Sequence, residues 1–339
     1  MTKKRYIEFD VLRALAIIGV LLIHVSAQVL LSKNGMDNSI ALFINQVSRF
    51  AVPVFLILSG WGLTMSNSLK NGYLLFLKKQ ILKIIVLYII WNVIYYIATV
   101  HSFNILKFIK SFILGSTYYH LYFVPLIIVF YLIYPFILKI GKSNLGLLFM
   151  LVVTIFSQEI AMITGSGMLN DNRNIFNWIF FFTLGSWLAH DYDSKVEKLR
   201  KFRLPIIVLF ITTLAAVFFE SYFLIDKVGI KMAIASTRPS IILLSVLFLA
   251  IFLGIKWENS FFIQPLLNLA TIAYGVYLSH ALFLAVFNKV FMKLGFSMES
   301  ILYMPVAFIF VLVVSIFVTI GINKIIDVIS GEFKNHNTY

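Results

Sequence analysis

Long runs of apolar residues recur along the whole 339-residue chain, and they constrain its fold more than any other feature. A helix needs about 20 mostly apolar residues to cross the hydrocarbon core of a bilayer. Ten runs approach or exceed this length, at 9–31, 41–66, 80–100, 120–139, 144–163, 175–190, 204–224, 236–254, 265–290 and 300–326. With 61% hydrophobic and 12% charged residues, the chain has too little polar surface for a soluble body. The sequence therefore predicts an all-α integral membrane protein with about ten transmembrane helices in one bundle.

The basic residues indicate how this bundle is oriented. Cytoplasmic segments of membrane proteins carry an excess of lysine and arginine. When the N-terminus is placed inside, most of the 28 lysines and arginines fall in inner segments, so both termini are expected in the cytoplasm. The net charge of +14 then reflects membrane topology, and no nucleic-acid partner is expected. We expect a single transmembrane domain over residues 1–330 and a short cytoplasmic tail over 331–339. Without cysteine, disulfides and thiol chemistry are excluded.

Ionisable side chains inside the predicted spans are the candidate functional residues, because charge is costly in the hydrocarbon core. At about 1.5 Å per residue, five of them fall in one layer of the outer half of the bilayer: His24, Arg49, Glu159, Glu220 and His280. Apolar packing does not require such a layer, whereas a polar cavity open to the outside explains it. The simpler alternatives are that each histidine is a packing residue and that both glutamates reach outer water near their helix ends.

The first span carries a second pattern. Arg13 and His24 are eleven residues apart, which is about three helical turns, so they share one helix face. Asp10 precedes Arg13 by three residues and lies within pairing reach. A charged cluster near the inner surface and an imidazole deep in the bilayer suit a ligand that crosses much of the membrane. The alternative is that Arg13 anchors the helix end by snorkelling. No metal-ligand pair at helical spacing is present, and no metal is expected.

Four ordered motifs resemble the acyltransferase-3 family of bacterial membrane O-acyltransferases. In RYIEFDVLRALAIIGVLLIH, the family's spacing of a basic residue, ten positions and a histidine is filled by Arg13 and His24. The stretch RFAVPVFLILSGWGL is similar to the family's second span, with matches at Arg49, Pro53, Phe55, Ser59, Gly60 and Trp61. YHLYF is similar to a His-Leu-Trp-Phe element and IAYGVYLSH to a Tyr-Gly-x-Tyr-Leu-x-His motif, with matches at His120, Tyr122, Tyr274, Tyr277 and His280.

One element departs from the family pattern. After the second span the family often has an Arg-x-x-Arg pair that is implicated in handling acyl-CoA. Here the stretch KKQILKII puts Gln80 and Lys83 at those positions, with Lys78 and Lys79 just before them. Lysine can hold phosphate as a point charge, but it lacks the bidentate geometry of arginine. Some family members are fused to an extracytoplasmic esterase-like domain, and this chain resembles the stand-alone members.

The resemblance implies transfer of an acyl group, by default acetyl, from cytoplasmic acyl-CoA to a hydroxyl of an extracytoplasmic or lipid-linked envelope glycan. The protein is then expected in the bacterial inner membrane among its lipids. Acyl-CoA is a co-substrate, and no permanently bound cofactor is expected. The resemblance implies that His24 acts as general base and that Arg49 stabilises charge on the thioester oxygen. It further implies that His280 binds the acceptor or assists proton transfer.

The other matched residues are assigned to substrate binding or support. The CoA phosphates are expected to meet Arg13, Lys78, Lys79 and Lys83, and Asp10 is assigned to substrate binding beside Arg13. The channel is expected to be shaped by Ser59, Gly60 and Trp61, and the substrate to be contacted by His120 and Tyr277. We expect His24 to be oriented by Glu159 or Glu220. Two other classes stay open: an exporter or flippase, which needs no acyl-CoA, and a scaffold for a polysaccharide synthase. The sequence leaves the acceptor, the acyl group and the oligomeric state open, as well as the choice between direct transfer and an acyl-histidine intermediate.

Overall fold

The computed structural model describes residues 6–32, 38–99, 104–165 and 171–336, with side chains described as far as Val328. Within these ranges the chain is helical and contains no strand. The long helices are α1 (Ile7–Leu30), α4 (Tyr73–Thr99), α6 (Phe123–Ile140), α7 (Asn144–Thr164), α10 (Arg203–Val228), α13 (Gln264–Lys293) and α14 (Tyr303–His336). The shorter helices are α2 (Ser39–Val47), η1 (Ser48–Phe50), α3 (Ala51–Met65), α5 (Ile105–Leu114), η2 (Ile175–Asn177), α8 (Ile179–Ala189), α9 (Tyr192–Lys201), α11 (Ile230–Ala233) and α12 (Pro239–Gly254).

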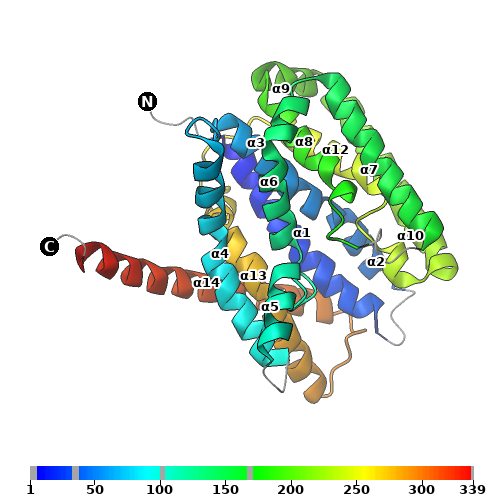
Figure 1. Cartoon of the computed structure of the whole chain (residues 1–339). Coiled ribbons are helices and arrows are strands. Elements are labelled where there is room, and N and C mark those ends of the chain that lie inside the picture. The colour runs from blue at the N-terminus through cyan, green and yellow to red at the C-terminus, as the bar shows by residue number, and fades with distance from the viewer. Residues whose placement is uncertain (1–5, 33–37, 100–103, 166–170, 337–339) are drawn as a thin grey trace.

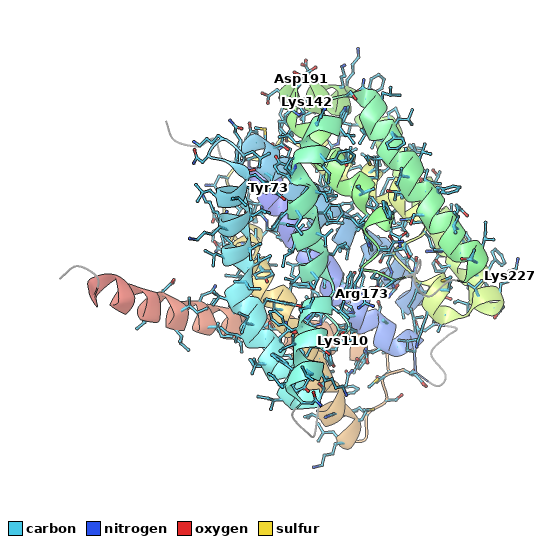
Figure 2. The ribbon with its side chains drawn as sticks, in the orientation of Figure 1. Tyr73, Lys110, Lys142, Arg173, Asp191 and Lys227 are labelled. Atoms are coloured by element: carbon cyan, nitrogen blue, oxygen red, sulfur yellow. The ribbon has the colours of Figure 1, made fainter. Side chains whose placement is uncertain are left out.

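The helices confirm the predicted all-α membrane fold. Among the described residues, eight helices are long and apolar enough to cross a membrane, when α2 to α3 is taken as one segment, Ser39–Met65. The shorter apolar helices α8 and α12 complete the set of ten predicted spans. Figure 2 shows Lys142 and Asp191, from predicted inner segments, at the end of the bundle opposite Lys110 and Lys227, from predicted outer segments. The number of crossings and the side of each terminus stay predictions.

Helix α1 lies at the centre of the bundle. It contacts α2, α3, α12, α13 and α14, and Figure 1 shows it crossing behind α6 with neighbours on both sides. Leu12, Ile17 and Leu21 are fully buried. Apolar side chains alone do not make membrane helices associate, because lipid tails are equally apolar. Polar contacts add to this packing: Ser26 of α1 is fully buried and accepts a hydrogen bond from Asn45 of α2 at 3.0 Å.

The second span is interrupted at the position of Arg49. The turn η1 joins α2 to α3 there with the tighter geometry of a 3₁₀ helix. Pro53 lies four residues after Arg49 and has no backbone N–H, so it cannot donate to the Arg49 carbonyl. One turn earlier, the hydroxyl of Ser48 donates to the Ile44 carbonyl, at 2.8 Å. The local sequence thus loosens the helix where a buried guanidinium has to be placed.

Two glycines bring α3 and α8 into backbone contact. A Cβ atom built on Gly60 would lie 2.1 Å from the carbonyl oxygen of Phe182, and one built on Gly185 would lie 2.0 Å from that of Ile57. Small residues allow membrane helices to approach this closely. The interface anchors the α3 half of the second span, which carries part of the site described below.

Three segments differ from the sequence expectation. Residues 105–114 and 192–201, expected in loops, form helices α5 and α9. Asn104 caps α5 by accepting from the backbone N–H of Lys107, at 2.9 Å, and Gly115 ends it with a positive φ of 62°. Helix α14 continues to His336, into the predicted tail, and its C-terminal part projects beyond the bundle in Figure 1. The division into a domain and a tail stays a prediction.

Candidate active site

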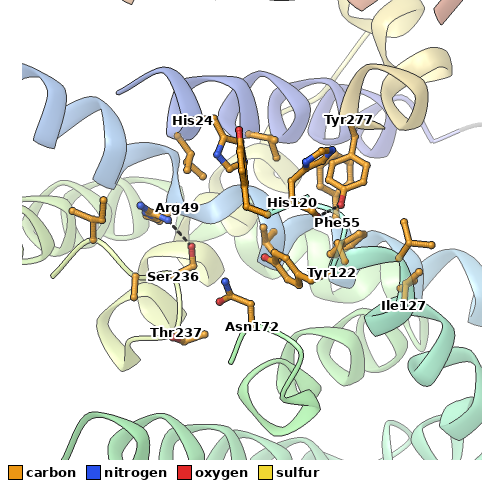
Figure 3. Close-up of a pocket in the computed structure, with 18 of the residues that line it drawn as sticks. His24, Arg49, Phe55, His120, Tyr122, Ile127, Asn172, Ser236, Thr237 and Tyr277 are labelled. Atoms are coloured by element: carbon orange, nitrogen blue, oxygen red, sulfur yellow. Dashed lines mark hydrogen bonds between the residues drawn. The ribbon is translucent and has the colours of Figure 1, made fainter. Parts of the chain in front are cut away.

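A cavity of about 840 Å³ follows α1 through the bundle. Along the first span it is lined by Arg13, Val20, Ile23, His24 and Leu31. At 1.5 Å per residue, Arg13 to Leu31 corresponds to about 27 Å, close to the thickness of the hydrocarbon core. The other walls come from α3, α6, α13 and the segment 228–237 that connects α10 to α12. Figure 3 shows His24, Arg49, His120 and Tyr277 around this space. One cavity therefore joins the two functional groups predicted on the first span.

Three histidines from distant parts of the sequence form a cluster beside the cavity. The ring centroids of His24 and His280 are 5.1 Å apart with nearly parallel planes, and those of His120 and His280 are 4.9 Å apart. His24 is half-buried in the cavity wall, whereas His280 is fully buried behind it. Nδ1 of His280 lies 2.6 Å from the Tyr277 carbonyl oxygen, and Nε2 of His120 lies 3.3 Å from that of Leu278. Within the described chain, Nε2 of His280 and Nδ1 of His120 are buried without hydrogen-bond partners.

Helix α13 is locally opened next to His280 by a tyrosine from α4. The Tyr95 hydroxyl donates to the Leu278 carbonyl at 2.9 Å and accepts from the Leu282 N–H at 3.0 Å. In an undisturbed helix, the Leu282 N–H would donate directly to the Leu278 carbonyl. Insertion of a side chain into this ladder is a recognised cause of helix distortion. The turn that carries His280 is therefore shaped from outside α13.

Arg49 is buried and held by neutral side chains. Its Nε and Nη2 donate to Oδ1 of Asn45, at 3.0 and 2.5 Å, and its Nη1 donates to the hydroxyl of Ser236 at 3.0 Å. Asn45 in turn donates to the Ile23 carbonyl and to the Ser26 hydroxyl, at 3.1 and 3.0 Å. These bonds tie Arg49 to the turn of α1 that carries His24. The two residues predicted to act together thus share one part of the cavity.

A second arginine, Arg238, lies buried behind this wall with 1% of its surface exposed. Its Nη2 donates to Gln46 at 2.5 Å and to Ser221 at 2.8 Å, and its Nη1 lies 3.2 Å from Oε2 of Glu220. Ser240 also donates to Glu220, at 2.5 Å. The structure places Glu220 on Arg238, which corrects the expectation that this acid orients His24. The sequence placed both groups near the outer surface but did not reveal their pairing.

The other supporting acid also lies elsewhere. Glu159 is exposed on α7 and is not among the described residues that line the cavity. Its predicted depth agrees with that of His24, but its side chain lies on an exposed face of α7. Depth along a span is therefore not sufficient to bring a side chain to the site, because the rotation of the helix decides which neighbour it meets.

The residues of the second-span motif divide between two faces. Ser59 lines the cavity, and its hydroxyl donates to the Phe55 carbonyl at 2.8 Å. Gly60 lies instead in the α3–α8 interface, and Trp61 stacks on Phe9 with ring centroids 3.5 Å apart. Successive residues of a helix point about 100° apart, so three consecutive residues cannot share one wall. The expectation that all three shape the channel is corrected: Gly60 and Trp61 are packing residues.

At the inner end, the predicted pair of α1 is present. Nη1 of Arg13 lies 2.8 Å from Oδ1 of Asp10, and Arg13 lines the cavity. The three lysines predicted to meet CoA phosphates are exposed on the inner part of α4. Lys78 and Lys79 lie about one and a half turns before the lining residue Ile84, and Lys83 directly precedes it. None of the three lysines lines the described cavity.

The outer end of the cavity carries one further ion pair. Asn172 lines the cavity, and its neighbour Asp171 receives two hydrogen bonds from Nε of Arg173, at 2.8 and 2.9 Å. These bonds lower the pKa of Asp171, so the acid is ionised at neutral pH. Within the described chain, no group of three or more histidine, aspartate or glutamate side chains has the geometry to hold a metal ion.

Sequence reasoning missed two residues that position the site. Tyr95 is one of many aromatic residues in an apolar run, and nothing in its neighbourhood distinguishes it. Arg238 lies at the outer edge of the predicted span 236–254, where a basic residue does not stand out as an intramembrane charge. One signal was available, because Arg238 directly precedes Pro239 at the start of α12. A cation at a helix N-terminus is opposed by the helix dipole and therefore calls for a specific partner.

The fold and the site define a multi-pass membrane protein with a histidine- and arginine-lined cavity that follows its first span. The chain belongs to the acyltransferase-3 family: the family model, described as an acyltransferase domain, matches residues 6–320. This confirms the resemblance carried by the four motifs.

Curated relatives also match part of the chain. The probable poly-beta-1,6-N-acetyl-D-glucosamine export proteins of Staphylococcus aureus strains MSSA476 and MW2 are 27% identical over 230 residues, and that of strain MRSA252 is 26% identical. Each match covers 62% of this chain and 64% of the relative, which is less than two thirds of the relative's length. No solved structure matches the chain.

Proposed function

We propose that the protein is a membrane O-acyltransferase that moves an acyl group, by default acetyl, from cytoplasmic acyl-CoA to a hydroxyl of a cell-envelope glycan. The single cavity that follows α1 from Arg13 past His24 carries this proposal. Arg13 and His24 are about 16.5 Å apart along the helix axis. A donor bound at the inner surface therefore has to extend its thioester along the cavity to reach the imidazole. An inner-membrane location in a bacterium is part of the proposal.

The residues around the outer half of the cavity suit acyl transfer. In the proposed reaction, His24 takes the proton of the acceptor hydroxyl, and the freed oxygen attacks the thioester carbonyl carbon. The carbonyl oxygen becomes an oxyanion, which a guanidinium such as Arg49 stabilises well in a water-poor site. The C–S bond then breaks, and the CoA thiolate takes the proton back from His24. His280 and His120 support the first histidine, and Tyr277 packs beside them.

The acceptor is proposed to be a glycan because the curated relatives are named for a polymer of N-acetylglucosamine. Asn172, Ser236 and Thr237 add neutral polar groups to the outer half of the cavity lining. Such groups recognise sugar hydroxyls without requiring a charge on the sugar. A polymer or a lipid-linked intermediate of the envelope fits this description.

Export of a polysaccharide is the second candidate function. The printed name of the relatives favours it, and so does a cavity that follows most of α1. A carrier moves its substrate unchanged and needs no acyl-CoA. The two functions therefore differ in a property that can be measured on the purified protein.

The deciding experiment follows CoA release from acetyl-CoA and succinyl-CoA by the protein in nanodiscs, together with label retained on the protein. His24→Ala is expected to abolish turnover while the protein stays folded. The matched control is His190→Ala, since His190 lies at the end of α8 outside the described cavity lining and is expected to be dispensable. Turnover that survives His24→Ala refutes the assignment of the base. A folded wild-type protein that turns over neither thioester, with an envelope glycan supplied, supports export.

A further inference from the structure

The charges around the outer half of the cavity are distributed unevenly. Arg49 is buried, and among the described residues its hydrogen bonds go to two neutral side chains, Asn45 and Ser236. Buried charges in proteins are usually paired with an opposite charge, because desolvation of an unpaired ion is costly. The positive charge of Arg49 thus remains available to a ligand in the cavity.

Two acids lie near this end of the cavity, and each is bound by another arginine. Glu220 lies 3.2 Å from Nη1 of Arg238. Asp171 accepts hydrogen bonds from the side chain of Arg173, at 2.8 and 2.9 Å, and from its backbone N–H at 2.8 Å. Both of these acids are therefore engaged by arginines other than Arg49.

Arg238 stands between Glu220 and the group that holds Arg49. One side of its guanidinium faces Glu220, and the other donates to Gln46 at 2.5 Å. Gln46 adjoins Asn45 in sequence and donates to it, at 3.2 Å, and Asn45 accepts from Arg49. If Arg238 lost its charge, the nearest buried guanidinium in this network would be that of Arg49. Glu220 would then be attracted to the Arg49 guanidinium, because opposite charges interact more strongly where the effective dielectric constant is low.

We propose that Arg238 is a positioning residue for the acyl transfer: by binding Glu220, it keeps Arg49 free of a carboxylate partner. Arg49 can then stabilise the oxyanion that forms on the thioester carbonyl, and no ion pair between Arg49 and a carboxylate has to break first. This inference rests on the proposed function and adds to it a residue outside the cavity lining. It also gives a role to the buried Arg238, which pairs with the half-buried Glu220 outside the described cavity lining.

A charge-removal series tests the proposal by steady-state turnover of acetyl-CoA in nanodiscs. Arg238→Gln is expected to lower kcat by about 100-fold, the cost of losing one oxyanion-stabilising group, with little change in KM. Removing the acid as well, in Arg238→Gln with Glu220→Gln, is expected to restore kcat to within about 10-fold of wild type, because the carboxylate of Glu220 is then no longer present to pair with Arg49; tenfold corresponds to about 1.4 kcal/mol. Arg238→Lys keeps the charge and is expected to retain turnover. A double variant as slow as Arg238→Gln, with both folded and equal in Tm, overturns the proposal.

A second pair of variants tests the same idea should Arg238→Gln not fold. The hydroxyl of Ser236 already lies 3.0 Å from Nη1 of Arg49. Ser236→Asp would put a carboxylate on Arg49, whereas Ser236→Asn is a matched neutral control. The proposal predicts a kcat loss of about 100-fold for Ser236→Asp relative to Ser236→Asn, and equal rates refute it. Wild-type protein without thioester turnover refutes the proposed function, and this role with it. Turnover in wild type without rescue in the double variant refutes the role of Arg238 alone.

Discussion

The close contact between α3 and α8 makes a sharp prediction for a single added methyl group. In Gly60→Ala, the new Cβ would lie 2.1 Å from the Phe182 carbonyl oxygen, whereas ordinary contacts of a Cβ begin at 3.4 Å. The nearest atom belongs to the backbone of α8, so no side-chain rotation can relieve the clash. The two helices must separate by about 1.3 Å, and overpacking of this kind costs about 1–3 kcal/mol.

The matched control lies two residues further along the same helix. A Cβ on Gly62 meets nothing within 4 Å. Glycine in a helix interior is less favourable than alanine by about 0.5–1 kcal/mol, so Gly62→Ala is expected to be neutral or stabilising. The two substitutions are chemically identical, and they differ in their surroundings alone. The gain in helix propensity is common to both substitutions, so their unfolding free energies are expected to differ by the cost of overpacking, about 1–3 kcal/mol.

The measurement is unfolding in mixed micelles with increasing SDS, followed by loss of helical signal, with thermal denaturation as a second readout. Gly185→Ala, whose Cβ would lie 2.0 Å from the Ile57 carbonyl oxygen, is expected to behave like Gly60→Ala. Equal stability of Gly60→Ala and Gly62→Ala would show that α3 and α8 do not meet through their backbones, and the packing argument would fail.

Three further predictions concern the site. Tyr95→Phe removes the hydroxyl inserted into α13 and is expected to lower kcat about 10-fold or more, since a small misplacement of a catalytic group is costly. Tyr88→Phe is the control and should leave kcat near wild type, because it loses a hydroxyl that donates at 2.7 Å to the Phe112 carbonyl, about two helical turns away from Tyr95 along α4. Arg13→Ala is expected to raise KM for acyl-CoA with little effect on kcat, and an unchanged KM would remove Arg13 from the donor path. Trp61→Phe is expected to keep both constants while lowering Tm, because Trp61 packs on aromatic neighbours outside the cavity; a change in KM would contradict its assignment as a packing residue.

Much of the fold could be predicted because a bilayer admits few solutions. A run of about 20 apolar residues has to form a helix in hydrocarbon, since its backbone groups find no other partners there. The same reasoning placed Arg13 and His24 on one face, because residues eleven apart in a helix nearly eclipse each other. Both inferences use the geometry of one helix at a time. They hold in the structure, where the two residues line one cavity.

The tertiary structure decided which helices meet and which way each one is turned. It places His280 beside His24 and His120 beside His280, pairs Glu220 with Arg238, and leaves Glu159 exposed on α7. Depth along a span can be read from the sequence, but the rotation of a helix about its axis depends on contacts with partners far away in the chain. Those contacts are close-packed and specific, like the one at Gly60, and a 100° step separates a residue that lines the cavity from one that packs against a neighbouring helix.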